Sequence, residues 1–143
     1  MKKTATELAR EYYHHGYNCA EAIWLGLNDD LPDEQKALGL KLSSGFGGGM
    51  GCGGLCGGVA GAVMSIGRFY GRDLGGARKE DAKILAKELI AAIESKYGSA
   101  NCSDLKPATD DYRKRCVEYV AFCADKTIEL MDRGVVDEGC GWE

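Results

Sequence analysis

Apolar residues recur at helical spacing along most of the chain, and helix-start signals precede several of these stretches. Thr4 and Glu7 form a capping-box pattern that opens a first helix, which we expect to end at Gly16. Asn18 and Glu21 repeat the pattern just before the apolar run 22–25. Further helices are expected over residues 33–42, 56–70, 79–97 and 111–133.

The pattern in residues 33–42 leaves one alternative open. Leu38, Leu40 and Leu42 alternate with other residues, so a short strand there also fits the sequence. Elsewhere the strand signals are poor, and no linker or shift in composition divides the chain. We therefore predict an all-α, single-domain bundle of about five to six helices over residues 1–143, with a central glycine-rich loop–helix segment.

The central segment is unusually rich in glycine, with ten glycines in residues 45–61. A glycine inside a helix costs about 1 kcal/mol relative to alanine, so Gly57 and Gly61 indicate that something approaches the backbone closely. One candidate is a helix packed on the Gly57/Gly61 face, and a second, compatible one is a cofactor approached by backbone N–H groups of loop 47–54. The candidate cofactor-binding glycines are Gly47, Gly48, Gly49, Gly51 and Gly57.

Two nucleotide-binding motifs are excluded for this segment. Residues 49–54 satisfy G-x-G-x-x-G, but a dinucleotide fold also requires strands and repeated βα units, which the helical pattern lacks. No Lys-Ser or Lys-Thr follows the glycines, so there is no Walker A motif.

The composition and charge of the chain limit its expected binding partners and cellular location. The formal net charge of −4 gives no basic footprint for nucleic acid. The least polar segment, 42–71, is too interrupted by glycine for a membrane span. No apolar stretch follows the N-terminal lysines, so we expect no secretory signal and a cytoplasmic location, where thiols stay reduced.

The chain has seven cysteines, and a reducing compartment makes a disulfide framework unexpected. Cys19 and Cys102 each follow an asparagine at a predicted helix start, and Cys56 opens the helix after the glycine run. A thiol at a helix N-terminus faces unpaired N–H groups and the positive end of the helix dipole, which favours the thiolate. The alternative is that these cysteines are buried and only pack.

The remaining cysteines and the histidines give weaker indications of a functional role. Cys123 follows Cys116 by seven residues on the same helix face, so we expect it to pack in the core. Cys140 lies in a tail that gives no assignment. His14 and His15 are adjacent, point in different directions and cannot form a zinc pair by themselves, so we expect them at the surface.

Four stretches resemble a family of small redox-active proteins named for its cysteine signature, C_GCAxxG_C_C. They are GYNCAEAI (16–23), the glycine-rich segment 44–71, NCSDL (101–105) and CVEYV (116–120). The resemblance covers nearly the whole chain and implies that the shared cysteines are Cys19, Cys56, Cys102 and Cys116. The family's central motif, C-G-A-x-x-G, would run over residues 56–61, with Gly58 in place of the alanine and Cys52 outside the set.

Three hypotheses follow for these four cysteines. The leading one is that they converge on one iron–sulfur cluster that serves electron transfer, with [2Fe–2S] as the preferred type. The second is thiol–disulfide exchange by a pair such as Cys56 and Cys102, although the chain has no C-x-x-C motif. The third is a structural zinc adaptor, for which only Cys52 and Cys56 approach the usual ligand spacing.

The expected partner is a redox protein or an oxidoreductase, with no nucleic acid and no membrane span. The sequence leaves open whether the chain is itself an oxidoreductase accessory or a simple electron carrier, and a homodimer is one option for its assembly.

Overall fold

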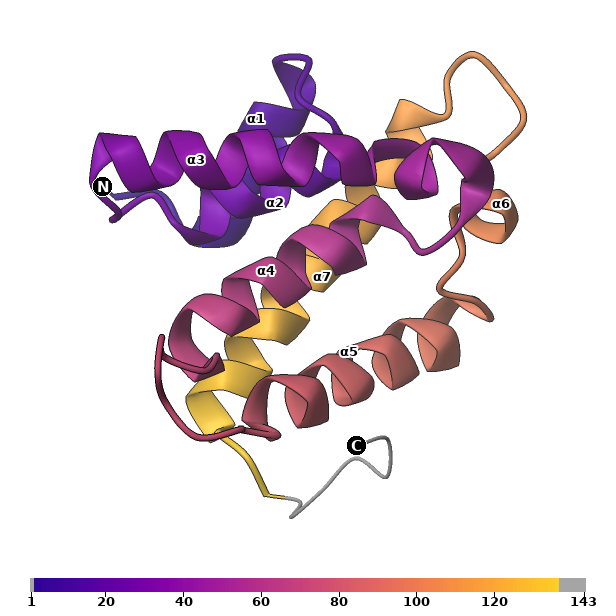
Figure 1. Cartoon of the computed structure of the whole chain (residues 1–143). Helices are drawn as coiled ribbons and strands as arrows, with labels where there is room; N and C mark the ends of the chain where they lie inside the picture. Colours follow the sequence, from indigo (N-terminus) through magenta and orange to yellow (C-terminus); the bar gives the residue numbers. More distant parts are fainter. Residues whose placement is uncertain (1, 137–143) are drawn as a thin grey trace.

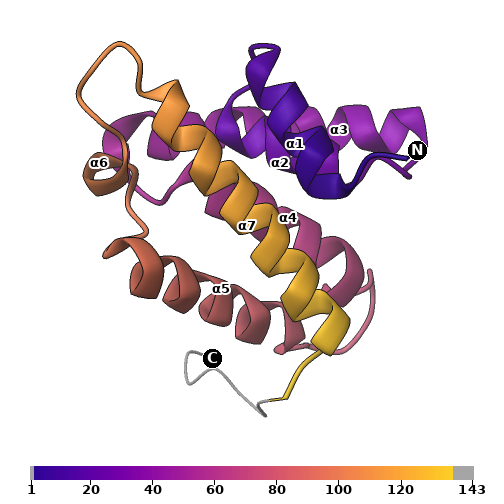
Figure 2. The same ribbon diagram turned by 180° about the vertical axis from the view of Figure 1, so that it is seen from behind.

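The computed structural model describes residues 2–136, which form a bundle of helices joined by turns (Figures 1 and 2). The α-helices are α1 (Ala5–His14), α2 (Cys19–Leu27), α3 (Asp33–Ser43), α4 (Gly57–Tyr70), α5 (Asp81–Tyr97), α6 (Cys102–Leu105) and α7 (Arg113–Arg133). A 3₁₀ turn, η1 (Ser44–Phe46), and a wider turn, η2 (Gly49–Gly53), lie between α3 and α4. Residues 2–136 contain no strand, so the all-α prediction is confirmed.

Local sequence explains where the first helices begin. Both predicted capping boxes are present: Thr4 with Glu7, and Asn18 with Glu21. The Glu21 N–H donates to Asn18 Oδ1 at 2.8 Å, and the Asn18 N–H donates to Glu21 Oε1 at 2.9 Å. These bonds satisfy N–H groups that a helix start otherwise leaves unpaired. They also fix Cys19 as the first residue of α2.

The strand alternative for residues 38–42 is wrong, because this stretch belongs to α3. In a helix, Leu38 and Leu42 share one face, and this face is exposed. Beside this face Gly39 is buried against Trp24, and a β-carbon at Gly39 would overlap the indole ring. The three leucines therefore lie on different sides of one helix, with Leu40 half-buried, and do not form a strand.

Helices α2 and α4 form the centre of the bundle. α2 contacts α1, α3, α4 and α7, while α4 also contacts α5 and α7. α4 and α7 run side by side across the molecule, with α5 along one flank (Figures 1 and 2). Large apolar side chains without solvent exposure fill the core between them, among them Ile23, Val59, Ile66, Leu89 and Val120. None of the described helices combines the length and apolarity that a membrane crossing requires.

The predicted packing of a helix on the Gly57/Gly61 face is confirmed. A β-carbon at Gly61 would lie 2.5 Å from the Ala20 carbonyl oxygen, and one at Gly57 would overlap the Cys19 sulfur. A larger side chain at Gly61 would displace the backbone of α2, and one at Gly57 would displace the Cys19 side chain and the Phe46 carbonyl. The glycines therefore let the N-terminal ends of α2 and α4 meet, which brings Cys19 close to Cys56.

Candidate functional site

Four cysteines from four separate helix starts line one cavity. Cys19 and Cys102 are the first residues of α2 and α6, Cys56 immediately precedes α4, and Cys116 lies in the first turn of α7. Together with Gly57, Leu105, Lys106 and Tyr119 they surround a volume of about 20 Å³. We refer to Cys19, Cys56, Cys102 and Cys116 as the cavity cysteines.

Backbone hydrogen bonds hold the start of α4 against the start of α6. The Cys56 N–H donates to the Ala100 carbonyl at 2.8 Å, and the Cys102 N–H donates to the Gly54 carbonyl at 2.6 Å. Leu55 and Asn101 form an isolated antiparallel bridge between these two bonds. Two segments far apart in the sequence thus deliver Cys56 and Cys102 to the same cavity.

The glycine-rich loop lies beside this junction in a left-handed conformation. Its positive-φ residues are Gly48, Gly49, Met50, Gly51 and Gly53, and Met50 is the one residue other than glycine with positive φ among residues 2–136. Such a run of backbone is accessible mainly to glycine, which explains the composition of the loop.

The candidate cofactor-binding glycines do not all reach the cavity. Gly57 lines it, and the Gly48 N–H hydrogen-bonds to Cys19. A β-carbon at Gly49 would lie 2.7 Å from Cys102 Cβ, so this glycine allows a close approach to α6. Gly47 instead packs on the Asn18 side chain, and a β-carbon at Gly51 would meet no other atom within 4 Å.

Burial dominates the electrostatics of Cys19 and corrects one expectation. The N–H groups of Gly48 and Ala20 lower the pKa of its thiol, as a helix N-terminus should. Removal from water raises the pKa by more, so the net pKa lies above the ordinary value of 9.0. The prediction that a helix start makes this cysteine a thiolate is therefore wrong for the protein without a bound cation.

The same balance holds at two more cavity cysteines. Burial, followed by the charge of Cys19, raises the pKa of Cys56 to about 11 against the N–H groups of Gly58 and Val59. Burial also raises the pKa of Cys116, and the Tyr13 hydroxyl acts against it as a hydrogen-bond donor. These sulfurs are consequently protonated thiols at neutral pH, each with a donor in place to support a thiolate once a positive charge is present.

The start of α6 does not repeat the cap of α2. Asn101 makes no side-chain cap hydrogen bond, although its sequence context matches that of Asn18. Asp104 instead accepts a hydrogen bond from Ser99 Oγ at 2.7 Å, and Ser99 Oγ accepts one from the Asn101 N–H at 3.0 Å. The backbone bond from Cys102 to Gly54 already holds this four-residue helix, so the asparagine cap is not needed.

The remaining cysteines and histidines lie elsewhere. Cys52 is exposed on the glycine-rich loop, and its thiol donates to the Gly49 carbonyl at 3.5 Å. Cys123 is fully buried in α7, which confirms its predicted place in the core. His14 and His15 are exposed, as expected. Cys140 lies outside the described residues.

Sequence reasoning missed the side chains that complete the cavity. Tyr119 lies one helical turn after Cys116, a spacing that puts both on one face of α7 and that could have identified it. Its hydroxyl donates to the Leu105 carbonyl at 2.7 Å and thereby ties α7 to α6. No local signal indicates Tyr13, because α1 reaches Cys116 only through the tertiary fold.

The atoms of the cavity that could bind a metal are sulfurs, and hydrogen-bond donors surround them. Within residues 2–136, no three cysteine, histidine, aspartate or glutamate side chains are positioned to share a single metal ion. The four thiols match in number and type the ligand set of an iron–sulfur cluster, whose metal atoms are bound by different cysteines. With a volume of about 20 Å³, the cavity between the sulfurs is small.

Comparison with known proteins identifies the pattern formed by these cysteines. The model of the family described as "Putative redox-active protein (C_GCAxxG_C_C)" matches residues 17–130 and thus includes all four cavity cysteines. No curated protein and no solved structure matches the chain.

Proposed function

The chain belongs to the redox-active protein family with the C_GCAxxG_C_C signature, and from this premise we propose that its four cavity cysteines hold an iron–sulfur cluster for electron transfer. The observation that carries the proposal is the convergence of four thiols, from four distant segments, on one cavity. Four cysteines are the standard ligand set of [2Fe–2S] and [4Fe–4S] clusters. The small volume of the cavity favours the smaller one.

The surroundings of the sulfurs support this assignment. Backbone N–H groups of Gly48 and Ala20 point to Cys19, and those of Gly58 and Val59 point to Cys56. Hydrogen bonds of this kind stabilise coordinated thiolates and tune their reduction potential. The apolar walls limit access of water to the site. A bound cluster would supply the capacity to accept and release single electrons, while the chain holds and shields the four sulfurs.

The two other hypotheses fit the cavity less well. A structural zinc ion needs four ligands at about 2.0–2.3 Å from one point, and no described group of three is arranged in this way. Thiol–disulfide exchange needs a readily formed thiolate, whereas burial raises the pKa of Cys56 to about 11. A cluster would also need these thiols as thiolates, and its bound iron would have to displace the protons that burial retains.

Metal and sulfide analysis of the full chain tests the proposal. Protein purified without oxygen, or reconstituted with iron and sulfide, should be coloured, bleach with dithionite and contain both elements in equal amounts. Cys56→Ser should abolish the colour, since a serine hydroxyl replaces one thiolate ligand. Cys123→Ser and Cys52→Ser are the matched controls and should keep it, because neither sulfur lines the cavity.

Three other results would each contradict the proposal. Zinc in place of iron and sulfide would support the adaptor hypothesis. A colourless, metal-free protein that reversibly loses two thiols on mild oxidation would support thiol–disulfide exchange. Loss of the cluster on replacing Cys123 would show that the ligand set is different.

A further inference from the structure

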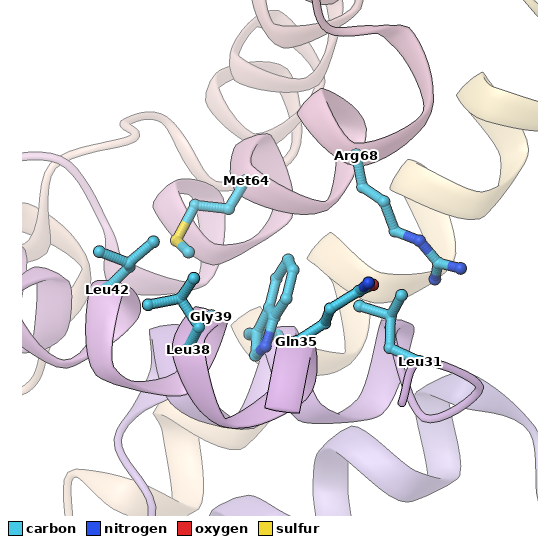
Figure 3. Close-up of a pocket in the computed structure, with 8 residues that line it drawn as sticks. Leu31, Gln35, Leu38, Gly39, Leu42, Met64 and Arg68 are labelled. Carbon is cyan, nitrogen blue, oxygen red and sulfur yellow. The ribbon is translucent and has the colours of Figure 1, made fainter. Parts of the chain in front are cut away.

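An apolar groove lies between α3 and α4 (Figure 3). Leu38 and Leu42 of α3, Met64 of α4 and the largely buried Trp24 of α2 line it. Its volume is about 450 Å³. The Trp24 indole is fixed there, because its Nε1–H donates to the Lys36 carbonyl at 2.9 Å. The groove is therefore built from positioned side chains.

The one charged side chain that lines the groove is already paired. The Arg68 guanidinium donates to both carboxylate oxygens of Asp30, at 2.8 and 2.9 Å, and to Asn28 Oδ1 at 3.2 Å. It also stacks on the Phe69 ring, 4.5 Å from the ring centroid. A charged small molecule would have to compete with these contacts, so the groove suits an apolar occupant.

The same helix that walls the groove carries an exposed apolar stripe. Leu38 is 58% exposed and Leu42 is 62% exposed, and their spacing of four places them on one face of α3. Glu34 and Lys41 border this stripe at its two ends. Within residues 2–136 neither of them takes part in an ion pair. The surface thus contains an apolar groove and, along its wall, an apolar ridge formed by these two exposed leucines.

We infer that this surface, formed by α3 and the groove beside it, binds a second copy of the chain as a two-fold symmetric dimer. A symmetric interface requires a patch that complements itself, and a ridge next to a groove meets this condition. With the α3 helices antiparallel across an axis near Leu38, Glu34 of each copy faces Lys41 of the other. Both ion pairs then flank the leucine contacts, which matches the acidic first turn and basic last turn of α3.

Sedimentation analysis of the full chain over a wide concentration series tests the inference, with reductant present so that exposed Cys52 cannot crosslink two chains. The wild-type mass should approach twice 15.4 kDa at high concentration. Leu38→Glu should raise the dimer dissociation constant by about 100-fold or more, because both copies lose an apolar contact and gain an unpaired charge. Leu74→Glu changes a fully exposed leucine outside the surface and should leave the dissociation constant unchanged.

Charge reversal tests the orientation of the two copies. Glu34→Lys and Lys41→Glu should each weaken the dimer by about 3- to 10-fold, since each variant puts like charges opposite one another. An equimolar mixture of the two variants should restore dimers, because opposite charges then face each other in the mixed pair. A wild-type chain that stays at 15.4 kDa at every concentration would overturn the inference, as would equal disruption by Leu74→Glu. The test does not depend on whether the cysteines hold a cluster.

Discussion

The Cys19 sulfur lies in the space that a side chain at Gly57 would occupy, so the sulfur and this glycine are packed directly against each other. A β-carbon at Gly57 would also lie 2.9 Å from the Phe46 carbonyl oxygen, which is backbone and cannot rotate away. Gly57 therefore fixes both the contact between α2 and α4 and the position of one candidate ligand.

Gly57→Ala is expected to destabilise the fold by about 1–3 kcal/mol, the usual cost of overpacking a well-packed core. It should also reduce iron and sulfide content, because Cys19 is displaced. Gly58→Ala is the matched control. Its β-carbon would make only ordinary contacts, 3.5 Å from Cys123 Sγ and 3.7 Å from Cys56 Sγ, and alanine favours the helix by up to about 1 kcal/mol. Chemical denaturation of both variants measures the difference, and equal stability would contradict the packing argument.

Alkylation of the reduced, metal-free protein should follow the burial of its thiols. Exposed Cys52 is expected to react first and fully buried Cys123 last. Cys56 should react slowly near neutral pH, since a pKa raised to about 11 leaves little thiolate, and its rate should increase as the pH rises. Mass spectrometry of peptides after timed iodoacetamide exposure gives the order. A Cys56 that reacts as fast as Cys52 at neutral pH would instead favour thiol–disulfide exchange.

Helix positions could be predicted because their signals are local. The capping boxes of Thr4 and Asn18 lie within a few residues of the starts they determine, and both are present. At Asn101 the same pattern predicts the helix start correctly, since α6 begins at Cys102, but the predicted side-chain cap is absent. A backbone bond from Cys102 to the distant Gly54 holds this helix instead, and no local pattern encodes that bond.

The chemistry of the site was less predictable than its residues. Sequence position indicates that Cys19 begins a helix, and a helix start favours the thiolate. Burial has the larger effect on the pKa and comes from the packing of α4, α6 and α7 around the cavity, which no local pattern encodes. Tyr13 was missed for the same reason, since it lies beside Cys116 only through the fold, whereas the helical spacing of Tyr119 from Cys116 could have indicated that residue.

Thr127 is the one buried side chain among the described residues whose polar atom has no hydrogen-bond partner. It lies in α7 without solvent exposure, so its hydroxyl carries a desolvation cost without compensation. Thr127→Val keeps the shape and removes the hydroxyl, and we expect it to stabilise the protein by about 1 kcal/mol. Thr109→Val is a suitable control, because the Thr109 hydroxyl donates to Asp111 at 2.6 Å. Removal of this bonded hydroxyl should not stabilise the protein. Thermal denaturation of both variants tests the difference, and a loss of stability in Thr127→Val would show that the hydroxyl has a partner.

Tyr13 offers a test of how the chain tunes the proposed cluster. The side chain is 3% exposed, its hydroxyl is a donor beside Cys116, and the Arg113 guanidinium lies 3.8 Å from its ring centroid. Tyr13→Phe keeps the ring and removes the donor. Because a donor to sulfur stabilises the negative charge that grows on reduction, the reduction potential of the reconstituted protein should become more negative.

Tyr12→Phe is the matched control for this change, since the Tyr12 ring packs edge-on against Tyr17, with centroids 5.6 Å apart. Its potential should equal that of the wild type. The metal-free protein gives a second readout: loss of the Tyr13 donor raises the pKa of Cys116 further, so alkylation of Cys116 should become slower at a fixed pH. If alkylation slows but the potential of the loaded protein does not move, Tyr13 acts on the free thiol and Cys116 is not a ligand. Unchanged alkylation and an unchanged potential together would show that the hydroxyl does not reach the sulfur.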